Sequence, residues 1–364
     1  MDQQSDKALR ICSPNIPRAM RERRRSLNSL PRRRRGPQDL VVMLDGTLST
    51  LDPQWATNIG QIFHVLSAIP ARQRPCIYYE PGLQFDTMRD SWSVMAGVGL
   101  NRQIARAYGW LASRYRPGDR IFLLGYSRGA FAVRSLAGII DQIGLLKSRA
   151  ATERNVRDIY RHYRIGGQTP VARRFAKSLC HWNTPIEMVG VFDTVKALGL
   201  RLPILNKLSE AKHSFHYPEL SHNVSHGYHA LALHETRQAF CPVLWRQPEG
   251  WTGRVEQMWF RGTHGDIGGQ LSHFAPARQL SNIPLSWMLE KIEGLNIALP
   301  SKWRAKFPCD ADAPSSGNFK GWGKVFLLRR RRIVGMDGSE KLHSSIGSHL
   351  IPRGVDLPLG AVGA

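Results

Sequence analysis

No apolar run in this 364-residue sequence is long enough to cross a bilayer. A membrane-spanning helix needs about 20 consecutive apolar residues. The apolar segment 40–44 ends at Asp45, whereas a signal peptide needs an apolar core of about 7–15 residues. We therefore expect a soluble or peripheral protein in the cytoplasm, and the sequence leaves open export by a route without a signal peptide.

Cysteines are few and scattered, with five in the chain and no CxxC pair. This pattern indicates neither a disulfide framework nor a zinc knuckle, and it favours a reducing compartment. Histidines gather between residues 213 and 234, and helical spacing would place His226 and His229 on one face. Because no His-Glu-x-x-His motif accompanies them, we expect neither a metal nor another cofactor.

Acidic residues are outnumbered, with 28 Asp and Glu against 51 Lys and Arg, which gives a formal charge of +23. Such a charge favours anionic partners such as phosphate-bearing lipid surfaces or nucleic acid, and we expect nucleic acid to be the weaker candidate. Arginines dominate the start of the chain, so residues 1–38 are predicted to form a disordered basic arm. The arm is either an electrostatic anchor for an anionic membrane or a solvated tail.

Residues 39–345 are predicted to form one α/β domain, because short apolar runs alternate with segments of helical periodicity. We expect an α/β fold with a mostly parallel central sheet and helices on both faces. Segment 200–228 interrupts the alternation and is interpreted as a lid or insertion, and 346–364 as a loosely held tail. The expected strands are 39–44, 74–79, 120–124, 185–192 and 257–260, and the expected helices are 58–69, 98–115, 130–143 and 228–237.

A serine flanked by two glycines follows the third expected strand, in Gly125-Tyr-Ser-Arg-Gly129. A Gly-x-Ser-x-Gly motif alone is a weak signal, but an apolar strand before it and an apolar helix after it supply the required context. Side chains in place of the glycines would collide with the neighbouring strand or helix. Ser127 is therefore the expected nucleophile, with the Arg128 amide facing any developing negative charge. The alternative is an ordinary strand-to-helix turn.

A serine nucleophile needs a base and an orienting acid, and this fold places them in the chain order serine, acid, histidine. Asp193 follows the expected strand 185–192 and is the predicted acid, although aspartate at a strand end is often a helix N-cap. His264 follows the strand 257–260 in a glycine-rich loop and is the predicted general base. Asp266 is a secondary candidate that either orients His264 or makes local turn contacts.

The loop after the first strand, Asp45-Gly-Thr47, should border the nucleophile. An amide of Gly46 or Thr47 is expected to supply a second donor to an oxyanion. The Asp45 carboxylate is expected to stabilise the turn itself.

Five short motifs stand in order along the chain: Asp45-Gly-Thr47, Tyr78-Tyr-Glu-Pro-Gly82, Gly125-Tyr-Ser-Arg-Gly-Ala130, Phe192-Asp-Thr-Val195 and Trp259-Phe-Arg-Gly-Thr-His-Gly-Asp-Ile-Gly-Gly269. Together they resemble one family, the α/β-hydrolase domain shared with type VI secretion phospholipase effectors, which implies an α/β-hydrolase-like fold. The resemblance covers about residues 39–345, and it implies ester hydrolysis by Ser127, Asp193 and His264 with glycerophospholipids as substrates of effector members. His234 stands where the family usually carries an acidic residue, and the long regions that effectors use for membrane docking are absent.

The leading hypothesis is a serine hydrolase that cleaves carboxylic esters, with phospholipids among the candidate substrates. The competing hypothesis is a catalytically silent protein of the same fold that binds anionic membrane or nucleic acid through its basic arm. The sequence leaves the acyl-chain preference and the oligomeric state open.

Overall fold

The computed structural model describes residues 35–82, 98–167, 169–181, 183–195, 219–318 and 328–347. The chain divides into two units, residues 1–36 and 37–364, and the fold below is that of the second. Most of the expected basic arm lies outside the described residues, as do 200–218 of the expected lid and 348–364 of the expected tail. These three segments stay predictions.

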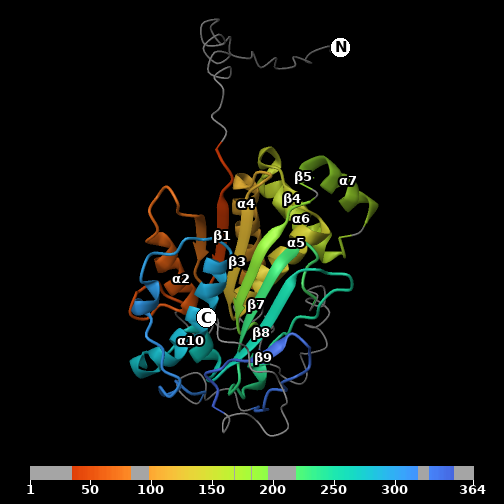
Figure 1. Ribbon diagram of the computed structural model, residues 1–364. Helices are drawn as coiled ribbons and strands as arrows, with labels where there is room; N and C mark the ends of the chain where they lie inside the picture. Colours follow the sequence, from red (N-terminus) through yellow and green to blue (C-terminus); the bar gives the residue numbers. More distant parts are fainter. Residues whose placement is uncertain are drawn as a thin grey trace, which may run out of the picture. The chain divides into compact units, whose positions relative to one another are not determined.

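Seven parallel strands form the central sheet in the order β2-β1-β3-β6-β7-β8-β9 (Figure 1). The inner strands are apolar along most of their length, as expected for a parallel sheet covered on both faces. A separate antiparallel pair joins β4 (Leu145–Leu146) to β5 (Cys180–His181). The sheet strands are β1 (Asp39–Leu44), β2 (Cys76–Glu80), β3 (Arg120–Tyr126), β6 (Ile186–Phe192), β7 (Val224–Ala232), β8 (Arg254–Phe260) and β9 (Glu340–Leu342).

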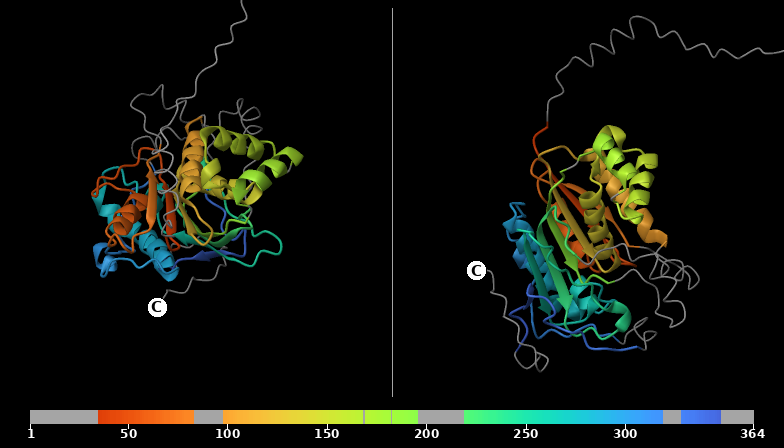
Figure 2. Two further views of the ribbon diagram at one scale, coloured as in Figure 1. Left: turned by 90° about the horizontal axis from the view of Figure 1, so that it is seen from above. Right: turned by 90° about the vertical axis from the view of Figure 1, so that its right-hand side faces the viewer.

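Helices cover both faces of this sheet, and alternate side chains of β1 show how the core is divided. Leu40 and Val42 pack into one buried cluster, while Val41 and Met43 pack into another, because successive side chains of a strand point to opposite faces. Figure 2 shows the helices on the two sides of the strands. The first cluster includes α4 (Val98–Arg114), α5 (Arg128–Gln142), α6 (Glu153–Arg164) and α7 (Pro170–Leu179), and the second includes α2 (Asn58–Ser67) and α10 (Arg278–Gly294).

The expected helix at 228–237 is wrong, because its first half, 228–232, belongs to strand β7. β7 is paired in parallel with β6 on one side and with β8 on the other, and residues 227–232 are all buried. A strand buried on both faces is apolar along its length and lacks the alternation that identifies a half-buried strand. The same strand takes up 224–228 of the expected insertion.

None of the helices in the described part of the chain is long and apolar enough to cross a membrane. The fold is the expected α/β class, with a mostly parallel sheet and helices on both faces. Because the strands run in parallel, the loops after β1, β3, β6, β7 and β8 leave the same edge of the sheet. That edge carries the candidate site.

Candidate active site

Ser127 occupies a strained turn between β3 and α5. Its backbone has φ 57° and ψ −118°, a positive φ that residues other than glycine seldom adopt. The Ser127 amide donates to the Phe192 carbonyl oxygen at 3.0 Å, which ties the turn to the end of β6. A Cβ added at Gly129 would lie 2.0 Å from the Leu44 carbonyl oxygen, and one at Gly125 would lie 2.6 Å from the Gly129 oxygen. Both glycines are therefore sterically required, as the motif predicted.

The side chain of His264 lies beside this serine. Its Nε2 lies 2.9 Å from Ser127 Oγ, and the imidazole is packed between the rings of Tyr126 and Phe240, with centroid distances of 4.9 and 4.7 Å. His264 is the first residue of the short helix α9 (His264–Gly268). The helix start is fixed by a capping box in which Thr263 and Asp266 satisfy each other's backbone amides.

Asp193 lies behind the histidine, at the end of β6. Its Oδ2 is 2.6 Å from His264 Nδ1, and its Oδ1 accepts from the Ala232 amide at 3.0 Å. Like Ser127, Asp193 has a positive φ, here 41°. The three predicted residues therefore form a continuous hydrogen-bonded chain, with Nδ1–H of the histidine donating to the carboxylate and Nε2 facing the hydroxyl.

A buried arginine, Arg332, binds the carboxylate of Asp193 with both terminal nitrogens. Nη1 lies 2.5 Å from Oδ1 and Nη2 lies 2.8 Å from Oδ2. Burial by itself would raise the pKa of Asp193, but the charge and hydrogen bonds of Arg332, together with the bond to His264, lower it well below its usual range. Burial lowers the pKa of His264, and the hydrogen bond to Asp193 offsets only part of this decrease. The site is therefore held as an ionised carboxylate beside a neutral imidazole near neutral pH.

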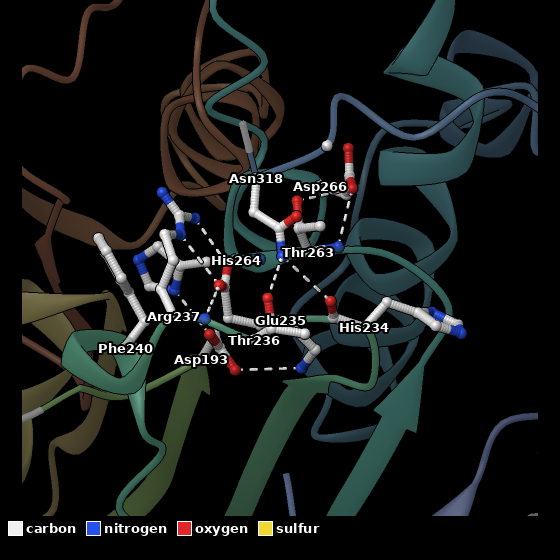
Figure 3. A network of polar contacts seen from close by, with 12 residues as sticks. Asp193, His234, Glu235, Thr236, Arg237, Phe240, Thr263, His264, Asp266 and Asn318 are labelled. Atoms are coloured by element: carbon white, nitrogen blue, oxygen red, sulfur yellow. Dashed lines mark hydrogen bonds and ion pairs between the residues drawn. The ribbon is translucent and has the colours of Figure 1, made fainter. Parts of the chain in front are cut away.

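A second carboxylate–arginine pair holds the other side of the histidine. Glu235 accepts from the His264 amide at 3.2 Å and from the Arg237 side chain at 2.6 and 2.9 Å (Figure 3). The Arg237 guanidinium lies 4.1 Å from the centroid of the Phe240 ring, and that ring packs on His264. The loop after β7 thus fixes both the backbone and one face of the base.

Asp266 does not contact the imidazole, so the second of its two expected roles applies. Oδ2 accepts from the Thr263 amide at 2.8 Å, and Oδ1 accepts from the Ser316 amide at 2.8 Å. Ser315 also donates to Oδ2 at 2.5 Å. Asp266 is a carboxylate that ties the start of α9 to segment 315–316.

The loop after β1 contacts Arg128, the residue that follows the candidate nucleophile. The Arg128 guanidinium donates to the Thr47 hydroxyl, and burial lowers the pKa of Arg128 to about 10. The Gly46 amide donates to Asp45 Oδ1 at 2.7 Å, so this amide is engaged within its own turn. Of the two expected second donors, the Gly46 amide is thus engaged, and the role of the Thr47 amide stays a prediction.

Asp45 stabilises its turn as expected and does more. Its Oδ2 accepts from the Thr57 hydroxyl at 2.6 Å and from the Tyr79 hydroxyl at 2.8 Å. Burial raises its pKa to about 6, although the hydrogen bonds from Thr57, Gly46 and Tyr79 lower it in part. Asp45 therefore links β1, β2 and the start of α2.

The histidines of β7 do not share a face, because residues three apart in a strand point to opposite sides. His226 Nδ1 lies 2.9 Å from the Glu187 carbonyl oxygen, whereas His229 Nε2 accepts from the Thr194 amide at 3.1 Å. Within the described ranges no three His, Cys, Asp or Glu residues gather as metal ligands.

The structure places the three predicted residues together, with His264 within hydrogen-bond distance of both Ser127 and Asp193. Arg332, Glu235 and Arg237 were not predicted from the sequence. Glu235 directly follows His234, the residue of this segment at which the chain departs from the pattern of the family. Arg332 stands in a run of four arginines, a pattern usually typical of a solvated face, and nothing local distinguishes the one that turns inward.

The mostly parallel sheet and the serine at its strand-to-helix turn define an α/β-hydrolase-like protein. A family model described as the catalytic domain of Tle1-like phospholipase effectors of type VI secretion matches residues 38–291. The chain belongs to this family, and this membership supports the conclusion that it is a hydrolase.

A yeast protein and two solved structures are also similar to this chain. An uncharacterized protein of Saccharomyces cerevisiae is 29% identical in an alignment of 227 positions that covers 56% of this chain and 32% of that protein. Among solved structures, an uncharacterized protein from Pseudomonas aeruginosa matches with a TM-score of 0.40 and 17% identity, over 84% of this chain and 53% of that one. The Tle1 effector bound to the VgrG spike matches with a TM-score of 0.35 and 15% identity, over 65% of this chain and 51% of that one. The chain thus spans a third to a half of these proteins.

Proposed function

We propose that this protein is a serine hydrolase that cleaves carboxylic esters, with Ser127 as nucleophile, His264 as general base and acid, and Asp193 as the orienting acid. The observation that carries the proposal is the unbroken hydrogen-bonded chain of 2.9 Å from Ser127 Oγ to His264 Nε2 and 2.6 Å from Nδ1 to Asp193 Oδ2. A nucleophile within reach of a base that is itself oriented by a third group is the geometry that covalent acyl transfer needs.

In the proposed reaction the Ser127 oxygen attacks the ester carbonyl carbon while its proton passes to His264 Nε2. The imidazolium then gives that proton to the departing alcohol, which leaves an acyl group on Ser127. A water molecule attacks the acyl group by the same route in reverse, and the carboxylic acid and free serine are released. Asp193 keeps the proton on Nδ1, so that Nε2 can accept.

The developing oxyanion is assigned to the amides of Arg128 and Thr47. Arg128 is the first residue of α5, and the first amides of a helix point along its positive dipole end. The Arg128 side chain holds Thr47 by its hydroxyl, while Gln270 Nε2 donates to the Thr47 carbonyl oxygen at 2.8 Å. These two bonds hold the side chain and the carbonyl group of Thr47, the residue whose amide would supply the second donor.

Phospholipids are the substrate class that we propose first, because the family model is that of a phospholipase effector domain. The formal charge of +23 suits peripheral contact with an anionic membrane surface. Cytoplasmic location and export without a signal peptide both stay proposals.

The test is covalent labelling of the purified full-length protein with a fluorophosphonate probe. We expect wild type to be labelled, Ser127→Ala to lose labelling, and Ser113→Ala, a matched change at an exposed serine of α4, to label like wild type. Equal labelling of the Ser127 variant and wild type would refute the assignment.

Substrate class is tested with vesicles of phosphatidylglycerol and phosphatidylethanolamine beside a soluble p-nitrophenyl ester. Release of free fatty acid and lysophospholipid by wild type, and not by Ser127→Ala, would support phospholipids. Hydrolysis of the soluble ester alone would limit the activity to small esters. Salt-sensitive vesicle or DNA binding without any labelling or turnover would favour the catalytically silent alternative.

A further inference from the structure

Arg332 reaches the candidate site from a segment far along the chain. Its side chain is 3% exposed, and 139 residues separate it from Asp193. Besides the two bonds to the carboxylate, Nη1 donates to the Ala232 carbonyl oxygen at 2.8 Å and Nη2 donates to the Phe240 carbonyl oxygen at 2.6 Å. The guanidinium is therefore fixed in place by the end of β7 and the loop that follows it.

The fork of Arg332 sets the plane of the Asp193 carboxylate. Each carboxylate oxygen has two donors: Ala232 N and Arg332 Nη1 at Oδ1, and His264 Nδ1 and Arg332 Nη2 at Oδ2. Rotation of the carboxylate toward or away from the histidine would break two parallel N–H···O bonds. A bidentate pair of this kind gives geometric specificity that a lysine cannot reproduce.

The charge of Arg332 also acts on the histidine. The groups that face His264 are Asp193 from β6, Glu235 and Arg237 from the loop after β7, the uncharged ring of Tyr126 from β3, and Arg332 through the carboxylate. Each carboxylate is paired with one arginine, so the surroundings of the imidazole are close to neutral. Without Arg332 one negative charge would be uncompensated beside the imidazole, which would favour its protonated form.

We propose that Arg332 is a positioning residue of the triad, whose fork holds the Asp193 carboxylate against His264 and whose charge keeps that histidine neutral at lower pH. The proposal rests on the proposed function for its kinetic consequences, but its electrostatic half concerns only the titration of His264. The two effects separate by substitution, because lysine keeps the charge and loses the fork, whereas glutamine loses the charge.

The first test is the pH dependence of kcat/KM for a soluble ester, measured on the full-length protein. We expect Arg332→Lys to lower kcat about 10- to 100-fold through misplacement of the base, with the acid limb of the profile unchanged. Arg332→Gln should lower kcat by a similar factor and move the acid limb upward by about one pH unit. Arg331→Gln is the matched control, since Arg331 is its exposed neighbour, and should leave both unchanged.

Two further measurements distinguish positioning from a purely structural role. Added guanidinium at millimolar concentration should restore activity to Arg332→Ala, with equal concentrations of urea and sodium chloride as controls. NMR titration of ¹³C-labelled histidine should show a higher pKa for His264 in Arg332→Gln than in wild type, and this readout needs no turnover. Loss of thermal stability without a shifted acid limb, without rescue and without a changed titration would overturn the proposal.

The same experiments separate this proposal from the function on which it rests. A wild-type protein that neither labels nor hydrolyses esters, while the His264 titration still shifts in Arg332→Gln, would refute the hydrolase function and leave the electrostatic role standing. Normal wild-type activity with unchanged kcat, profile and titration in Arg332→Gln would refute the role of Arg332 alone.

Discussion

Alanine at Gly129 and alanine at Gly109 should have opposite effects on stability, although the chemical change is the same. An added Cβ at Gly129 would lie 2.0 Å from the Leu44 carbonyl oxygen and 2.6 Å from the Asp45 oxygen. Both atoms belong to the backbone of β1 and the loop that follows it. An added Cβ at Gly109, inside α4, would meet only a Val156 methyl group at 3.7 Å, which is an ordinary contact.

The magnitudes follow from these contacts. Relief of the clash at Gly129 needs α5 and β1 to separate by about 1 Å or more, because a Cβ essentially never lies within 3.0 Å of a backbone oxygen. Overpacking of this kind costs about 3 kcal/mol of unfolding free energy, the upper part of its usual range. Gly109→Ala should instead add about 0.5–1 kcal/mol, since alanine loses less backbone entropy than glycine in a helix. The two variants should differ by about 4 kcal/mol.

Urea unfolding followed by circular dichroism measures the difference, and fluorophosphonate labelling reports the site. We expect Gly129→Ala to unfold at lower urea concentration and to label poorly, because the same movement displaces Ser127. Gly109→Ala should unfold at higher urea concentration and label like wild type. A Gly129→Ala protein as stable and as reactive as wild type would contradict the requirement for glycine in this turn.

Three further substitutions test other parts of the structure. Asp193→Asn should lower kcat about 10⁴-fold, measured by steady-state kinetics, because it favours the wrong tautomer of His264. It should also lower the free energy of unfolding by about 3–5 kcal/mol, measured by urea unfolding, because it leaves Arg332 buried without its anion. Burial lowers the pKa of His229 to about 3, so the unfolded chain binds a proton that the native state does not as pH falls from about 6.5 toward 3. His229→Gln should therefore lose less stability than wild type between pH 6.5 and 5, measured by unfolding at each pH. Thr57→Ala should cost about 1–2 kcal/mol, because it removes the α2 N-cap bond to the Gly60 amide at 3.1 Å.

The sequence predicted those parts of the site that depend on local context. Ser127 lies between an apolar strand and an apolar helix, and Asp193 and His264 each follow an apolar run, so their neighbours in the chain identify them. Arg332 and Glu235 depend on contacts made across the fold, and the burial that distinguishes Arg332 from Arg331 appears only when the chain is folded. For the same reason the engagement of the Gly46 amide by Asp45 could not be read from the motif.

The error at strand β7 did not change which three residues were predicted for the triad. The expected helix at 228–237 would have left β6 and β8 as neighbours, whereas β7 lies between them. The order serine, acid, histidine requires only that each residue follow a parallel strand, and that condition holds with or without β7. The exact spacing does depend on this strand, because its last residue, Ala232, supplies the amide that holds Asp193 and the carbonyl oxygen that holds Arg332. A strand that carries none of the triad therefore sets how the acid faces the base.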